Sequence, residues 1–204
     1  MTSAVVYFDG GSSTPPGKKK KNELKVSWGV VSCMEDEQIE VNGMVVKKRG
    51  QVTSGCHEWV ALIEATLLMH NRGYKPHECS FYTDDQFIAF AHTYVQDENY
   101  LISSRDKVIA MIDYIVHWFY PNAEGLRELV FDYIKHSHMN WVKGHGLSVY
   151  NCRADYLVRQ ARSQAPLLSY DRWLADFCVL GGERARAIGA SFLNADRCHF
   201  RNML

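Results

Sequence analysis

The chain has 204 residues, of which 47% are hydrophobic and 12% are aromatic. This composition is typical of a folded protein with a core and excludes disorder along the whole chain. Basic and acidic residues number 23 each, so the formal net charge is zero. The charge balance gives no support to a uniformly basic surface for nucleic acids. Any contact with phosphates must therefore come from local clusters of cations.

Six cysteines show neither a Cys-x-x-Cys pair nor a regular spacing, which favours reduced thiols over a zinc site or a disulfide framework. The first residues lack the basic stretch and long apolar run of a secretion signal, and no apolar run reaches membrane-spanning length. We therefore expect a protein of the cytoplasm, or of the nucleus in a eukaryote, that is not secreted and has no membrane partner. A monomer is the expected state.

Strand and helix patterns alternate along the chain. Residues 4–8 form a continuous apolar run, which is typical of a strand buried on both faces. Residues 25–33 and 39–48 are two further strands that should pair as an antiparallel hairpin. A helix is expected from about Ser54–His57 to Asn71, with an apolar stripe at helical spacing. The remaining predicted elements are a strand at 79–84, a helix at 87–94, helices at 101–120 and 123–136 split by Pro121, a strand at 138–144 and a helix at 150–164.

The order of these elements predicts an α/β fold with a mixed five-stranded sheet and helices on both of its faces. Residues 1–164 should form this domain. Residues 165–204 contain two amphipathic segments joined by Gly181-Gly182. We expect them to form a short helical C-terminal extension that packs on the core.

Four acidic residues occupy positions where acids are locally unexpected. Asp9 and Asp84 follow apolar strands, Glu58 lies in the first turn of a helix, and Asp155 lies among apolar residues near the start of the last helix. Each alone is more often a turn former or a helix cap. Together they predict a metal site, because strand ends bring carboxylates to one sheet edge and a hard cation such as Mg²⁺ relieves their repulsion. Two such ions can drive hydrolysis of a phosphodiester.

The segments around these acids resemble, in order, the four motifs of the ribonuclease H family. DGGSSTPPG resembles the first motif, HEWVALIEATLL the second and YTDDQ the third. VKGHGLSVYNCRADYLVRQA is the most complete match, with its Gly-His, the Asn six residues after the His and the Ala-Asp near its middle. The motifs span residues 5–161, which is most of the chain. The chain is therefore similar to the type 1 ribonucleases H.

This resemblance implies the ribonuclease H-like fold and hydrolysis of the RNA strand of an RNA–DNA hybrid, leaving 5′-phosphate and 3′-hydroxyl ends. It implies that Asp9, Glu58, Asp84 and Asp155 bind two Mg²⁺ ions, for which Mn²⁺ can substitute. His145, which is flanked by two glycines, would assist proton movement or product departure. The residues that would contact the hybrid are Gly10, Gly11, Ser12, Ser54, Gly55 and Asn151.

The sequence also departs from the family pattern and leaves some assignments open. Thr53-Ser54-Gly55-Cys56 replaces the polar residues usual before the catalytic Glu, and Asp85 replaces a small polar residue, where we expect it to cap the next helix. Candidate phosphate contacts are Lys18 and Lys19, within the run of lysines at 18–21, together with Lys47, Lys48 and Arg49.

Three other functions on the same fold are alternatives. An inactive nucleic-acid-binding or scaffold module usually lacks a carboxylate, and none is missing here. A 3′–5′ exonuclease typically opens with Asp-x-Glu, whereas Asp9 precedes two glycines. A strand-transfer or resolvase enzyme is disfavoured by the NCRAD motif. The sequence leaves open the pathway and whether the protein acts beside a polymerase.

Overall fold

The computed structural model describes residues 3–14, 22–34, 37–53, 55–96, 102–144, 148–164 and 166–174. Five strands of this part of the chain form one mixed sheet in the order β3-β2-β1-β4-β5. β1 pairs antiparallel with β2 and parallel with β4, β2 pairs antiparallel with β3, and β4 pairs parallel with β5. The strands are β1 (Ala4–Ser13), β2 (Glu23–Cys33), β3 (Gln38–Lys48), β4 (Cys79–Thr83) and β5 (His138–Trp141).

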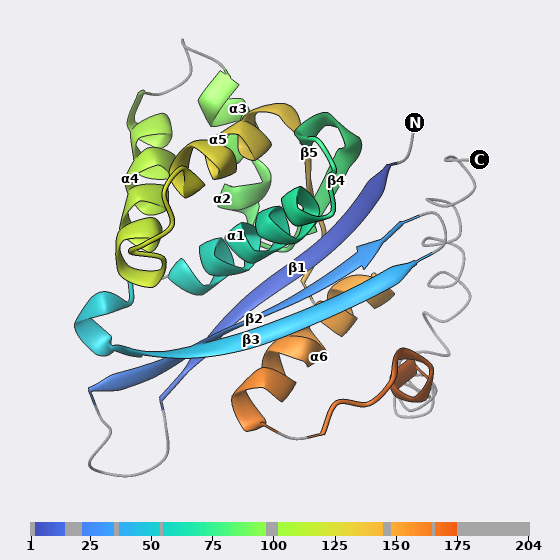
Figure 1. Ribbon diagram of the computed structural model, residues 1–204. Coiled ribbons are helices and arrows are strands. Elements are labelled where there is room, and N and C mark those ends of the chain that lie inside the picture. Colours follow the sequence, from blue (N-terminus) through green and yellow to red (C-terminus); the bar gives the residue numbers. More distant parts are fainter. Residues whose placement is uncertain are drawn as a thin grey trace.

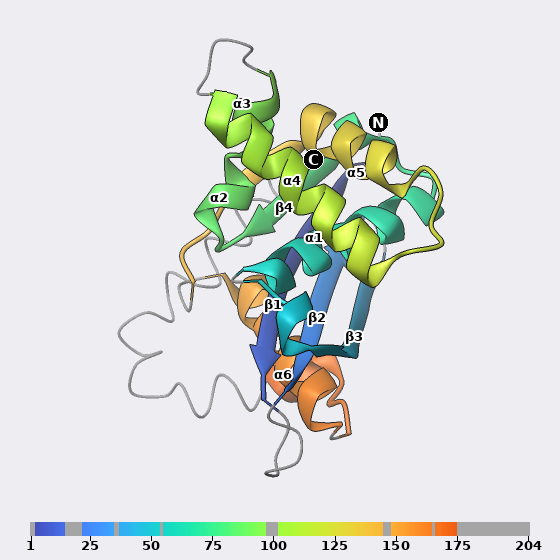
Figure 2. The same cartoon turned by 90° about the vertical axis from the view of Figure 1, so that its left-hand side faces the viewer.

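Helices cover both faces of this sheet. α1 packs on β1 and β2, with α4 and α5 outside it, while α6 packs on β1, β2 and β3. Figures 1 and 2 both place α6 on the side of the sheet opposite to α4 and α5. The predicted α/β fold, a mixed five-stranded sheet with helices on both faces, is confirmed. The helices are α1 (Cys56–Asn71), α2 (Gln86–Ala89), α3 (Ala91–Gln96), α4 (Ile102–Phe119), α5 (Leu126–His136) and α6 (Val149–Ser163).

The central strand β1 supplies side chains to two separate cores. Val6 and Phe8 point to the α1 side and join the larger core, which also includes residues of α4 and α5. Val5 and Tyr7 point to the other face, where they pack with Leu157 of α6. This alternation follows from the two-residue period of a strand, and it explains why the apolar run is continuous.

β1 is longer than the apolar run predicted. We expected the strand to end at Phe8 with Asp9 following it, but β1 continues through Asp9 to Ser13, which pairs with Lys25 of β2. The main-chain hydrogen bonds of an antiparallel hairpin need no apolar side chains, so the apolar pattern ends before the strand does. Asp9 therefore lies within the sheet.

Two other predicted elements differ in extent. The helix expected at 87–94 is two short helices, α2 and α3, which meet at Phe90. β5 ends at Trp141, and the Val142 N–H continues the pairing by donating to the Thr83 carbonyl at 2.9 Å. After β5 the chain passes close to the residue that follows β4, since a Cβ atom on Gly144 would lie 2.5 Å from Asp84 Oδ2.

Residues 166–174 return along α6. The Arg153 side chain donates to the Leu168 carbonyl at 2.7 Å, and the Leu168 N–H donates to the Tyr156 hydroxyl at 3.3 Å. The Trp173 ring lies 5.9 Å from the Tyr156 ring and is 6% exposed. This part of the predicted extension is therefore packed on the core, whereas residues 175–204, including Gly181-Gly182, lie outside the described residues.

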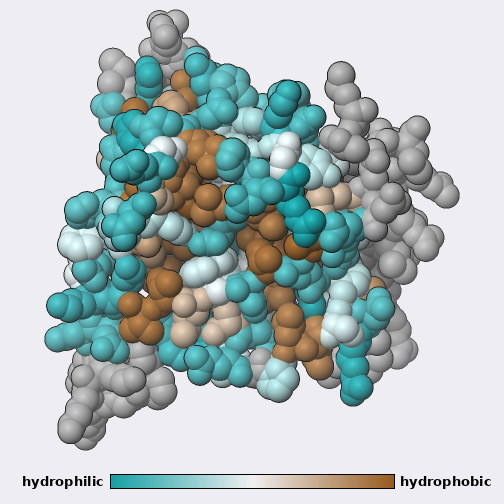
Figure 3. Space-filling model, viewed as in Figure 1, coloured by the Kyte–Doolittle hydropathy of each residue, from teal (hydrophilic) through white to brown (hydrophobic). Residues whose placement is uncertain are grey.

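The surface is mainly polar on the side seen in Figure 3, where hydrophobic residues form separate groups among hydrophilic ones. Within the described residues, no helix combines the length and the apolar character needed to cross a membrane. Four cysteines there form no disulfide bond with one another, namely Cys33, Cys56, Cys79 and Cys152.

Candidate active site

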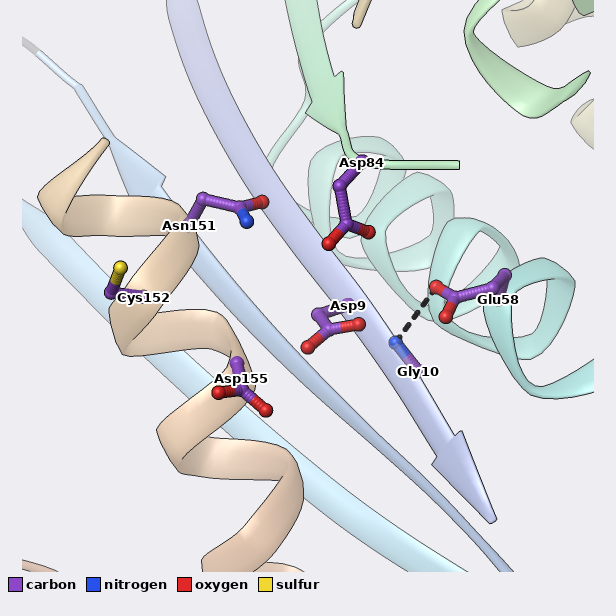
Figure 4. Close-up of a pocket in the computed structure, with 7 residues that line it drawn as sticks. All are labelled: Asp9, Gly10, Glu58, Asp84, Asn151, Cys152 and Asp155. Carbon is purple, nitrogen blue, oxygen red and sulfur yellow. Dashed lines mark hydrogen bonds between the residues drawn. The ribbon is translucent and has the colours of Figure 1, made fainter. Parts of the chain in front are cut away.

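Four acidic side chains from four segments line one pocket of about 230 Å³. Asp9 comes from the middle of β1 and Glu58 from the first turn of α1. Asp84 directly follows β4, and Asp155 comes from the second turn of α6. Figure 4 shows their carboxylates pointing into the space between β1, α1 and α6. The structure thus brings together all four carboxylates that the sequence singled out. The other lining residues are Gly10, Asn151 and Cys152.

The carboxylates are close enough to repel one another strongly. Oxygen atoms of Asp9, Glu58 and Asp84 all lie within 4.8 Å of one another. Burial, followed by repulsion from Glu58, Asp84 and Asp155, raises the pKa of Asp9 to about 9. Burial also raises the pKa of Glu58. Such a buried acidic cluster favours the binding of a cation.

Two glycines let helices approach the sheet at the level of Asp9. A Cβ atom on Gly10 would lie 2.2 Å from the His57 carbonyl oxygen, at the start of α1. Gly29 pairs with Asp9 across the hairpin, and a Cβ atom there would lie 2.4 Å from the Ala154 carbonyl oxygen of α6. No real Cβ atom tolerates these distances. The glycines therefore set how closely Glu58 and Asp155 come to Asp9.

Hydrogen bonds fix two of the acidic residues. The Gly10 N–H donates to Glu58 Oε2 at 2.9 Å, drawn as a dashed line in Figure 4. The indole N–H of Trp141 donates to the main-chain oxygen of Asp84 at 3.1 Å, although 45% of this residue is exposed. Strand β1 therefore holds the α1 carboxylate, and β5 holds the segment after β4.

On the α6 side of the pocket, Asp155 is accompanied by a cation and by uncharged side chains. The Arg159 guanidinium lies 3.0 Å from Asp155 Oδ2, one helical turn further along α6. Asn151 is 3% exposed, and its buried side-chain oxygen has no hydrogen-bond partner within the described residues. Cys152 also lines the pocket. Sequence reasoning missed Cys152 and Arg159, although a cation four residues after an acid on a helix is a recognisable pairing signal.

The two departures from the family pattern have structural counterparts. Asp85 caps α2 as expected, since its Oδ1 accepts from the Ile88 N–H at 2.9 Å. Gly55 precedes α1 with φ of 79°, a left-handed conformation that favours glycine. Ser54 lies outside the described residues.

The structure describes only some of the residues that the sequence predicts to contact nucleic acid. Gly11 lies against α6, where a Cβ atom would come within 2.7 Å of Val158, and the Ser12 carbonyl accepts from Arg162 at 3.2 Å. Neither residue lines the carboxylate pocket, in contrast to Gly10 and Asn151. The predicted residues Lys18, Lys19 and His145 lie outside the described residues, so their roles stay predictions.

Two of the three basic residues predicted as phosphate contacts at the end of β3, Lys47 and Arg49, are engaged within the protein. The Lys47 ammonium donates to the Trp118 carbonyl and lies 4.9 Å from the centre of the Phe119 ring. Arg49 donates to the Thr14 hydroxyl at 3.1 Å. Lys47 thus serves packing between β3 and α4, and Arg49 connects the end of β3 to the end of β1.

Comparison with known proteins finds a relative that is similar in sequence. No family model matches the chain. Ribonuclease H from Rickettsia bellii (strain RML369-C) is 25% identical over 171 residues, which are 81% of this chain and 92% of that protein. Among solved structures, LC11-RNase H1 in complex with an RNA/DNA hybrid is 17% identical, with a TM-score of 0.46 over 79% of this chain and 98% of that one. The protease-reverse transcriptase of prototype foamy virus is 16% identical, with a TM-score of 0.47 over 78% of this chain and 21% of that one. The sequence relative confirms the resemblance seen in the motifs, and it is the ribonuclease H family that this chain resembles.

Proposed function

We propose that the protein is a metal-dependent ribonuclease H, which hydrolyses the RNA strand of RNA–DNA hybrids at internal positions and leaves 5′-phosphate and 3′-hydroxyl ends. One observation carries the proposal: four carboxylates from four separate segments of the chain line a single pocket. The sequence similarity to the ribonuclease H of Rickettsia bellii supports it.

The donor set fits divalent metal ions. Carboxylate oxygens are the ligands that Mg²⁺ and Mn²⁺ prefer, and three of these side chains place oxygens within 4.8 Å of one another. Asp9, Glu58 and Asp84 would hold one ion, and Asp155 with Asp9 would hold a second. When bound, two such ions activate the attacking water and stabilise the leaving oxygen of the phosphodiester.

The surrounding residues position these ligands and the substrate. The Gly10 N–H fixes the orientation of the Glu58 carboxylate, and the Trp141 indole fixes the main chain at Asp84. Asn151 lines the pocket, and its buried amide oxygen has no hydrogen-bond partner within the described residues. A ribose 2′-hydroxyl is a donor of the right kind, and it is the group that distinguishes RNA from DNA.

The test compares three labelled substrates, an RNA–DNA hybrid, an RNA duplex and a DNA duplex, each with Mg²⁺, with Mn²⁺ and with EDTA. We expect internal cuts in the RNA strand of the hybrid alone, with either metal and not with EDTA. Shortening from the 3′ end one nucleotide at a time would instead identify an exonuclease. Hybrid binding without any cleavage would identify an inactive binding module, and both outcomes contradict the proposal.

A further inference from the structure

A second, open groove of about 450 Å³ lies at the far end of β1, beside the last two turns of α6. β1 and β2 form one wall, and α6 forms the other. The groove is rich in cations and hydroxyl groups and contains no acidic residue among its lining residues. These are Ser13, Thr14, Lys25, Arg159, Arg162 and Ser163.

The cations of the groove are held by neutral groups. Lys25 Nζ donates to the Arg162 carbonyl at 3.0 Å, and the Arg162 guanidinium donates to the Ser12 carbonyl at 3.2 Å. Within the described residues, the structure gives neither side chain a carboxylate partner. Their positive charges are therefore fixed in position and left to face an anion. Arg159 differs, since it pairs with Asp155 at 3.0 Å.

We propose that this groove binds backbone phosphates of the strand that is cut at the carboxylate pocket, with Lys25 and Arg162 as the main contacts. The proposal rests on the proposed function and names a subsite for its substrate. Guanidinium groups bind phosphate oxygens through two parallel hydrogen bonds, and a lysine acts as a point charge beside them. The hydroxyl groups of Ser13 and Thr14 add donors to the same groove.

The spacing along α6 matches that of a nucleic acid strand. Asp155, Arg159 and Arg162 are four and seven residues apart, so they share one face of the helix. With a rise of about 1.5 Å per residue, the two arginines lie about 6 and 10.5 Å beyond Asp155 along the helix axis. A nucleic acid duplex advances about 3.4 Å per nucleotide along its axis. A strand of a duplex whose axis runs parallel to α6 would therefore cover these distances in roughly two and three nucleotides.

The cations of the groove can offset the repulsion between the carboxylate pocket and a phosphate strand. The carboxylate pocket is acidic, and an approaching phosphate strand is repelled there until cations are bound. A cationic groove two to three nucleotides away attracts the same strand and holds it in line with the pocket. Because the whole chain has no net charge, such a local cluster is the way to obtain this attraction.

The experiment removes two charges and measures hybrid binding as a function of salt, in EDTA so that the RNA stays intact. Lys25→Gln with Arg162→Gln should reduce the slope of log affinity against log salt by about 2, that is, about one unit for each lost phosphate contact. The advantage of the wild type over this variant should then shrink roughly tenfold between 50 and 200 mM salt.

Two controls separate charge from folding. Lys25→Arg with Arg162→Lys disturbs the same hydrogen bonds but keeps both charges, so its slope should stay near that of the wild type. Lys75→Gln with Lys135→Gln removes two exposed charges at the opposite sheet edge, near the starts of β4 and β5, and should also leave the slope unchanged.

The position of the contact is tested with hybrids that carry one uncharged methylphosphonate in the RNA strand. Replacement two to three nucleotides from the cut should weaken binding to the wild type and have little further effect on the Gln variant. An unchanged salt slope in that variant, or no loss of wild-type binding for any replacement in the RNA strand, would overturn the groove assignment while leaving hybrid cleavage by the wild type intact. A wild type that neither binds nor cuts the hybrid would overturn the proposed function as well.

Discussion

The Arg153 guanidinium, which is completely buried, binds the Glu40 carboxylate through two hydrogen bonds of 2.9 and 2.6 Å. This pair joins α6 to the outer strand β3, two residues before Asp155. Tyr156, Tyr170 and Trp173 surround the same guanidinium, with ring centres 4.8 to 5.8 Å from its carbon atom. The placement of Asp155 therefore depends on a buried charge that other parts of the chain compensate.

Glu40→Ala should destabilise the protein by about 3–5 kcal/mol, because it leaves a buried guanidinium without its counter-charge. Combining Glu40→Leu with Arg153→Leu removes both charges and should cost much less. Chemical denaturation of the two variants provides the comparison. A double variant that is as unstable as Glu40→Ala would show that the pair itself supplies the stability.

Residues 166–174 should stabilise the folded domain that they pack on. Trp173→Ala removes the buried ring that packs on Tyr156, and such a truncation typically costs about 3–5 kcal/mol. Without this ring, residues 166–174 should no longer pack stably on α6. We therefore expect a chain ending at Gln164 to melt at a temperature close to that of Trp173→Ala, well below the wild type. Equal melting temperatures for all three proteins would mean that the segment does not contribute.

Gly29→Ala should disturb the site although residue 29 carries no functional group. The added Cβ atom would collide with the Ala154 carbonyl, so α6 must move away from β1. Overpacking of this kind typically costs about 1–3 kcal/mol. Calorimetric Mn²⁺ titration should show weaker binding, because Asp155 moves with the helix. Gly50→Ala is the matched control, since no atom lies within 4 Å of its added carbon, and it should bind Mn²⁺ as the wild type does.

The stability of the metal-free protein should fall as the pH rises. Burial and repulsion raise the pKa of Asp9 from 3.8 to about 9 in the folded state. Between these values the unfolded chain has released this proton while the folded chain retains it. Each unit by which the pH rises therefore lowers the free energy of unfolding. Thermal melts in EDTA should therefore show a decline from about pH 4 to pH 9, and Asp9→Asn should flatten it. A wild type whose stability rises over this range would contradict the assignment.

The sequence predicted the fold and the four carboxylates because both leave local signals. Apolar runs with turn residues between them predicted the strands, and acids in otherwise apolar surroundings predicted the pocket. Asp9 could not be placed inside β1, because main-chain pairing beyond Phe8 has no side-chain signature.

Other features depend on contacts between distant segments. Arg153 looks like a solvent-exposed arginine on a helix, and only Glu40 and the aromatic residues after α6 make its burial possible. Gly29 resembles any glycine in a strand until α6 is placed on it. The Lys25 and Arg162 groove likewise joins residues 137 positions apart. No local sequence pattern predicts that such distant residues will meet.

The most direct test of the central claim is single-turnover cleavage of a hybrid with Mg²⁺ by variants of each carboxylate. These variants are Asp9→Asn, Glu58→Gln, Asp84→Asn and Asp155→Asn, with the exposed Asp106→Asn of α4 as the control. We predict that each of the four slows cleavage by roughly three orders of magnitude or more while remaining folded, and that Asp106→Asn cuts at the wild-type rate. Near wild-type cleavage by all four folded variants would contradict the account.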